Sequence, residues 1–231
     1  MTDLSSSTTA ASQGGLVLAD RPDHAVSVKR VLRNTYALLS MTLLFSAGVA
    51  GLSVAQGWPA PGLLLSLGGM FGLLFAIHKL KNSGWGLVAT FGLTGFMGYT
   101  LGPVLSHTLA LPGGAQTIVM ALGVTGITTL ALSAYVLTTR RDFSAMGGFL
   151  FVGMIVALLL GLAAAFMNIP ALGLAVSGMV ALLSVGLILF ETSRIVNGGE
   201  TNYVLATIGL YVSIFNLFTS LLALFGMGGD D

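Results

Sequence analysis

The chain has 231 residues, of which 55% are hydrophobic, only 7% are charged and none is cysteine. Soluble domains carry about 25% charged residues, so this composition indicates an integral membrane protein and leaves little chain for a soluble domain. A formal net charge of +1 gives no electrostatic support for a nucleic-acid partner. The lack of cysteine excludes disulfides, thiol catalysis and thiolate metal sites together.

Seven apolar segments follow one another along the chain, and segments of about 20 residues can cross a hydrocarbon core of about 30 Å as α-helices. They are expected at residues 35–55, 62–77, 85–106, 115–137, 145–167, 171–190 and 203–226. Residues 1–27 begin with a small, polar stretch and are expected to form a disordered cytoplasmic tail. That tail is either an inert terminus or a handle for a partner. The predicted fold is an all-α, seven-helix transmembrane domain at residues 28–231.

All nine basic residues fall on one side of this seven-segment pattern. They precede the first segment or follow the second, fourth or sixth: Arg21, Lys29, Arg30, Arg33, Lys79, Lys81, Arg140, Arg141 and Arg194. Short loops rich in Lys and Arg stay on the cytoplasmic side of a membrane. The pattern therefore predicts a cytoplasmic N-terminus and a C-terminus on the opposite side.

Glycine is concentrated inside the apolar segments rather than between them. The third segment carries a stripe made of Gly92, Gly95, Gly98 and Gly102, and the second carries Gly68 and Gly72. Small residues let transmembrane helices approach closely. These stripes predict a tight bundle within one chain, with dimerisation through such a face as the weaker alternative.

The seventh segment has an ordered polar face. Small and polar residues recur there at spacings of three and four: Ala206, Gly209, Ser213, Asn216, Ser220 and Ala223, with Thr207 and Tyr211 as a second polar pair. Such spacings place residues on one face of a helix. Because lipid would leave the Asn216 amide unsatisfied, this face is expected to point into protein, with the helix near the middle of the bundle. It serves either as a set of interhelical hydrogen bonds or as a hydrated path for an ion.

Glu191 is the one carboxylate placed at the membrane boundary, at the end of the sixth segment. Acidic groups at that depth are costly and are usually paired or functional. Arg194 lies three residues further on the same helix face, so Glu191 is either a paired interfacial residue or a protonatable gate and cation ligand. Asp142 precedes the fifth segment and is expected to cap its helix.

The sequence lacks the motifs of common enzymes: it has no HExxH zinc motif, no phosphate-binding loop and no G-x-G-x-x-G at a strand–helix junction. Intramembrane proteases need a serine in G-x-S-G with a histidine, or two aspartates in adjacent helices, and no aspartate falls inside an apolar segment. His24, His78 and His107 are too scattered to meet at one metal ion. We therefore expect no enzymatic activity, no metal and no cofactor.

Five blocks carry a family resemblance: KRVLRNTYALLS, GFMGYTLGPVLS, SAYVLTTRRDFS, LFETSRIVNGGETNYVLAT and LYVSIFNLFTSLL. They resemble the transmembrane Bax inhibitor motif family in its bacterial YccA-like branch, from about residue 28 to the C-terminus. The resemblance implies a seven-helix fold with a central last helix, in the bacterial inner membrane. It also implies a partner, the membrane protease FtsH, which this branch modulates as a slowly processed substrate.

Other members of the family are pH-sensitive calcium leaks, which makes a calcium or cation leak the alternative function. Their path is closed by two aspartates, one in each of the last two helices. The resemblance matches Glu191 to the first and Ser213 to the second, with Asn216 close by and Lys79, Lys81 or Arg194 as basic partners. A glutamate and a serine cannot share a proton as two close carboxylates do. This departure favours the protease modulator over the leak.

Overall fold

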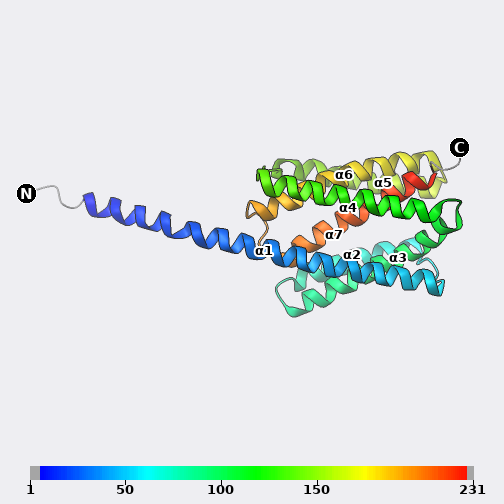
Figure 1. Cartoon of the computed structure of the whole chain (residues 1–231), viewed down its shortest axis with the longest axis horizontal. Helices are drawn as coiled ribbons and strands as arrows, with labels where there is room; N and C mark the ends of the chain where they lie inside the picture. Colours follow the sequence, from blue (N-terminus) through cyan, green and yellow to red (C-terminus); the bar gives the residue numbers. More distant parts are fainter. Residues whose placement is uncertain (1–5, 228–231) are drawn as a thin grey trace, which may run out of the picture.

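The computed structural model describes the backbone of residues 6–227 and the side chains of residues 27–226. Seven α-helices and one short 3-10 turn make up this part of the chain (Figure 1). They are α1 (Ser6–Gln56), α2 (Leu63–Leu80), α3 (Gly84–Ala110), α4 (Gly114–Thr139), η1 (Ser144–Met146), α5 (Gly147–Met167), α6 (Pro170–Val196) and α7 (Tyr203–Met227). Each helix contains a stretch long and apolar enough to span a membrane, which confirms the predicted all-α membrane bundle.

The last helix lies between two groups of helices. Helices α1, α2 and α3 gather on one side, α4, α5 and α6 on the other, and α7 runs between them (Figure 1). Helix α7 packs against α1, α3, α4 and α6. Half of the residues in its apolar stretch are buried, against 6% in that of α2. The polar face of the seventh segment therefore predicts the central position of α7 correctly.

Most helices extend beyond the apolar segments that predict them. Helix α6 continues to Val196, six residues past the predicted end at residue 190, and α3 continues to Ala110 rather than 106. An apolar run ends at the first charged residue, whereas helical hydrogen bonding continues into the polar interface. Apart from the start of α1, the other predicted starts and ends lie within about three residues of those observed, as expected for helix boundaries.

Helix α1 is the one large departure from the predicted bounds. It begins at Ser6 rather than near residue 35, and its first part projects away from the bundle as a single helix (Figure 1). This part covers most of the segment 1–27, for which the sequence predicts disorder. A lone helix in water has little to stabilise it besides its own backbone hydrogen bonds, so the disorder of the tail stays a prediction. Residues 1–5 lie outside the described part.

One of the two glycine stripes packs against a neighbouring helix. On α3, a Cβ atom added to Gly98 would meet the carbonyl oxygen of Ser46 on α1, and one added to Gly102 would meet the side chain of Ser53. Gly68 and Gly72 on α2 instead have open space beside them, so the prediction that this pair packs a helix of the same chain is wrong. The neighbouring Gly69 faces α3 instead and lies against Phe96. Helix α2 is therefore rotated about its own axis, so that the position next to Gly68 faces α3.

The loops that carry the basic residues meet at one end of the bundle. The side-chain amide of Asn202, in the α6–α7 loop, donates to the backbone carbonyl of Lys81 in the α2–α3 loop, at 3.1 Å. The backbone N–H of Phe143, in the α4–α5 loop, donates to the hydroxyl of Ser193 near the end of α6, at 2.9 Å. The basic residues after Ser27 therefore share this end, called the basic end below.

Candidate functional site: a polar cleft at the basic end

A cleft of about 550 Å³ opens at the basic end between α2, α6 and the start of α7. Its walls are mostly polar and charged: His78, Lys81, Asn82, Glu191, Arg194, Glu200, Thr201, Asn202 and Leu205 line it. Three sequence-predicted site residues, Glu191, Arg194 and Lys81, therefore belong to one feature. The cleft brings together side chains from the second, sixth and seventh helices and the loops beside them.

Glu191 is held against the central helix. Its side chain is 14% exposed, and its carboxyl group lies directly beside the backbone of Gly209 on α7, where an added Cβ would stand 2.7 Å from the Glu191 Cδ atom. One carboxylate oxygen of Glu191 lies 3.5 Å from a guanidinium nitrogen of Arg194. This contact belongs to the first of the two alternatives given for Glu191, a paired interfacial residue, and the role of a gate stays a prediction.

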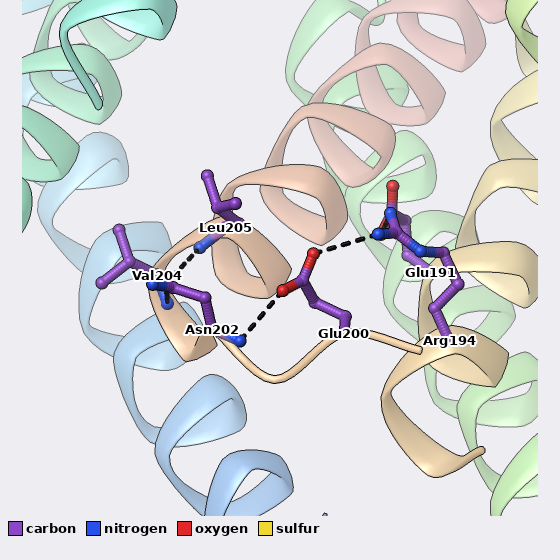
Figure 2. A network of polar contacts seen from close by, with 6 residues as sticks. All are labelled: Glu191, Arg194, Glu200, Asn202, Val204 and Leu205. Atoms are coloured by element: carbon purple, nitrogen blue, oxygen red, sulfur yellow. Dashed lines mark hydrogen bonds and ion pairs between the residues drawn. The ribbon is translucent and has the colours of Figure 1, made fainter. Parts of the chain in front are cut away.

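Arg194 also contacts a second carboxylate (Figure 2). Its other terminal nitrogen lies 3.1 Å from an oxygen of Glu200, whose side chain is 12% exposed. The guanidinium also stands over the ring of Phe190, 5.5 Å from its centre. Because this one cation neutralises two partly buried carboxylates and contacts an aromatic ring, its position is specified from three directions.

Asn202 connects this charge cluster to two other parts of the bundle. Its side-chain oxygen accepts the backbone N–H groups of Val204 and Leu205, at 3.0 and 3.2 Å, and so caps the start of α7 (Figure 2). Its amide nitrogen donates to Asn82 and to the carbonyl of Lys81 in the α2–α3 loop, at 2.9 and 3.1 Å. The backbone N–H of Asn202 donates to Glu200, at 2.9 Å. A single residue therefore links α7, the charge cluster and the α2–α3 loop.

The structure does not join Ser213 to Glu191 by a hydrogen bond. Ser213 is 3% exposed, and its hydroxyl donates to the carbonyl of Gly209 one turn earlier on its own helix, at 2.8 Å. Asn216 is half-buried, and no hydrogen bond of its side-chain amide occurs among the described residues. The three residues expected to form an ion path or gate therefore lie along the same region of the bundle without a direct polar contact between them.

The two lysines expected as basic partners differ in position. Lys81 lines the cleft that contains Glu191. The exposed side chain of Lys79 instead stands 5.6 Å from the centre of the Phe75 ring on α2. Neither lysine forms an ion pair within the part of the chain described here. Arg194 is thus the basic residue that holds Glu191.

Asp142 supports the basic end from the α4–α5 loop. One of its carboxylate oxygens accepts the backbone N–H of Ser144 at 2.8 Å and the hydroxyl of Ser193 at 3.5 Å. Hydrogen bonds from the side chain and the backbone of Ser144 hold the pKa of Asp142 below its usual range. The carboxylate caps the 3-10 turn η1, which leads into α5, rather than the first turn of α5 itself.

The sequence does not indicate three residues as members of this site: Glu200, Asn202 and Gly209. Gly209 belongs to it only through its contact with the carboxyl group of Glu191. Asn202 precedes an apolar run and so carries a recognisable helix N-cap signal. Glu200 lies six residues beyond Arg194 across a loop, a spacing without any periodic signal. Gly209 belongs to the polar face of α7, but its contact with the carboxyl of Glu191 depends on how α6 and α7 pack.

The cleft offers charge pairing rather than covalent chemistry. It contains two carboxylates, one arginine, one lysine and one histidine, an arrangement that can hold a charged group or pass a proton. No set of three His, Asp or Glu side chains that could hold a metal ion occurs among the described residues.

Comparison with known proteins places this bundle in a family. A family profile described as Inhibitor of apoptosis-promoting Bax1 matches residues 28–230. The chain is 50% identical, over 206 residues, to the Modulator of FtsH protease YccA of Escherichia coli (strain K12), covering 89% of this chain and 94% of that protein. It is 52% identical, over 205 residues, to an uncharacterized protein of Pseudomonas aeruginosa, covering 88% and 92% of the two chains.

A more distant relative extends the match along almost the whole chain. An uncharacterized protein of Neisseria meningitidis serogroup A is 31% identical over 221 residues, which cover 92% of this chain and 97% of that protein. The profile and these relatives agree with the resemblance carried by the five sequence blocks. The chain therefore belongs to the Bax inhibitor family, the family described as Inhibitor of apoptosis-promoting Bax1.

Proposed function

We propose that this chain binds the membrane protease FtsH and tempers its proteolysis, as a substrate that the protease processes slowly. The observation that carries the proposal is the 50% identity, along 89% of the chain, to a protein named a modulator of that protease. The chain sits in the bacterial inner membrane with its basic end and its N-terminus in the cytoplasm, because short basic loops resist translocation.

The proposed mechanism is occupancy of the protease. The N-terminal tail enters the cytosolic protease, and the packed seven-helix body resists extraction. The protease therefore stays occupied by this chain and degrades other substrates more slowly. Two features of the structure support it. The tail leads into α1, which contains the first membrane span, so a pull on the tail acts on that span first. The spans also carry buried polar side chains such as Tyr211 and Ser213, and moving polar groups through lipid is costly.

Co-purification tests the partner. The tagged full chain, solubilised from native membranes in a mild detergent, should bring down FtsH in an amount that depends on the tag. A matched control is an unrelated seven-helix membrane protein with the same tag and the same expression level. If FtsH is recovered equally with both baits, the proposed partnership is wrong.

The cleft favours a second candidate, a pH-sensitive calcium or cation leak. Glu191 reaches the wall of a cleft that opens at the basic end, as a cation path would require. Two features weigh against it: Ser213 stands where the leak branch has its second aspartate, and Arg194 already neutralises Glu191. The leak therefore remains the alternative.

A further inference from the structure

Three helices meet at Ser46, which lies ten residues before the end of α1. The Ser46 hydroxyl lies 2.6 Å from the hydroxyl of Tyr211 on α7, and Tyr211 in turn donates to the carbonyl of Thr94 on α3, at 3.4 Å. The backbone carbonyl of Ser46 fills the space beside Gly98 of α3. Ser46 is 5% exposed and Tyr211 is 1% exposed. We call these four residues, Ser46, Thr94, Gly98 and Tyr211, the Ser46 node.

The same face of α1 is tied to the bundle above and below the node. Toward the basic end, the hydroxyl of Thr207 on α7 lies 3.2 Å from the carbonyl oxygen of Thr35, and it shares its one hydrogen with the carbonyl of Tyr203 on its own helix, at 2.7 Å. Toward the other end, the hydroxyl of Ser53 donates to the carbonyl of Tyr99 on α3, at 3.3 Å. Positions 35, 46 and 53 lie close to whole numbers of turns apart at about 3.6 residues per turn. They therefore form one stripe along α1, with the node at its centre.

The Ser46 node differs from the contacts at Thr35 and Ser53 because a single residue of α1, Ser46, contacts both α3 and α7. Gly98 lets the backbone of α3 lie on the backbone of α1, and the hydroxyl of Ser46 crosses to α7 at the same level. If α1 is pulled along its axis, the contact between Ser46 and Tyr211 must break while α3 is still packed against the backbone of Ser46. Moving α3 aside first would instead uncover the buried Tyr211.

We infer that the Ser46 node sets how strongly the chain resists extraction from its N-terminal end, because α1 is the first helix that such a pull would remove from the bundle. The inference rests on the proposed function for its biological meaning, because only a protease that pulls from the tail would encounter this resistance. It assigns the slowness of processing to one contact between α1, α3 and α7, rather than to the hydrophobicity of the spans.

Constant-force pulling on the full chain in a lipid bilayer, through an N-terminal handle, tests the inference without a protease. In Gly98→Ala the added Cβ would meet the Ser46 carbonyl and force α1 and α3 apart, so the extraction rate of α1 should rise at least about tenfold. Ser46→Ala removes one hydroxyl and leaves the shape of the helix unchanged. Its extraction rate should rise about threefold, the worth of an average hydrogen bond in a bilayer.

Gly148→Ala on α5 is the matched control, because no atom lies within 4 Å of a Cβ added there. Its extraction rate should stay within about twofold of the parent. Equal extraction rates for the Gly98, Ser46 and Gly148 variants would overturn the inference. Should Gly98→Ala fail to fold, the Ser46 and Gly148 variants still decide the question.

Degradation by purified FtsH in proteoliposomes, with the same variants, separates the inference from the proposed function. If both hold, the order of degradation rates follows the order of extraction rates. If the variants differ under force but FtsH cleaves none of them, the Ser46 node stands and the proposed function is wrong. If FtsH degrades the Gly98 and Ser46 variants at the rate of the parent, the node does not limit processing and the inference is wrong.

Discussion

The carboxyl group of Glu191 on α6 lies against the backbone of Gly209 on α7, in the space that any larger residue at position 209 would fill with its Cβ. The contact explains why the central helix has a glycine at this level. It also sets the distance at which Arg194 can reach Glu191, because the carboxyl cannot move toward α7. The charge cluster at the basic end therefore depends on a residue that carries no charge and no side chain.

Gly209→Ala should destabilise the bundle by about 1 kcal/mol, the lower end of the cost of inserting a methyl group into a filled site, because the atoms that must move are the end of the Glu191 side chain. The measurement is unfolding in detergent micelles, followed by tryptophan fluorescence. Gly178→Ala on α6 is the control, because a Cβ added there has no atom within 4 Å. Equal stabilities of the two variants would mean that the Glu191 carboxyl moves away freely.

Arg194→Gln removes the one cation that contacts both Glu191 and Glu200, and leaves two partly buried carboxylates side by side. We expect a loss of about 1–3 kcal/mol in unfolding free energy, the cost of leaving buried polar groups without their partner. Adding Glu191→Gln to this variant should recover part of the loss. Arg141→Gln serves as the control because Arg141 is exposed. A destabilisation no larger than that of this control would contradict the assigned role of Arg194.

The fold follows from the sequence to a large extent because hydropathy and charge act on whole segments. Seven apolar runs, the alternation of basic loops and the polar face of α7 each depend on many residues, so the helices and the central position of α7 can be predicted. Helix rotation is a finer property. The choice between Gly68 and Gly69 as the residue that faces α3 depends on a rotation by one position, which a pattern of small residues does not determine.

The site was predictable only where its residues lie within one helix. Glu191 and Arg194 are three residues apart on α6, a spacing that offers their ion pair as one of two alternatives for Glu191. Glu200 and Asn202 reach the cluster through a loop whose path has no periodicity. The family resemblance matches Ser213 to the second position of a carboxylate pair, but the hydroxyl of Ser213 donates to the carbonyl of Gly209 on its own helix. A family pattern does not specify the rotamer of a substituted side chain.

Topology can be measured directly with reporter fusions. Fusions after residue 30 and within 79–84, 139–142 and 194–199 should report the cytoplasm, because these positions lie at the basic end. Fusions near 57–60, within 110–114 and after residue 228 should report the opposite side. A cytoplasmic C-terminus would contradict the orientation proposed above and would require one of the seven helices to re-enter rather than cross.

Ser213→Asp tests the cation leak. The substitution places a second carboxylate on α7 one turn beyond Gly209, and two close carboxylates cannot both ionise at low cost. If the chain leaks cations, calcium flux into liposomes should therefore gain a dependence on pH near neutrality in this variant, whereas the unmodified chain should show little flux and only a weak dependence on pH. Ser213→Asn has a similar size without the charge and is the control. A strong, pH-gated calcium flux through the unmodified chain would make the leak the first candidate.

The N-terminal tail is the proposed handle for FtsH. Deleting residues 2–20 should lengthen the lifetime of the chain in cells with active FtsH, because the protease loses its point of engagement, while membrane insertion is unchanged. Pulse-chase labelling measures the lifetime, and the same variants in cells depleted of FtsH provide the control. A lifetime unaffected by the deletion would leave the tail as an inert terminus.

The most direct test of the proposed function is the rate at which purified FtsH, reconstituted in liposomes, degrades an independent substrate in the presence of this chain. The full chain should lower that rate in proportion to its amount in the membrane, and the chain lacking residues 2–20 should lower it far less. A degradation rate unchanged by the full chain, at a chain-to-protease ratio well above one, would contradict the account.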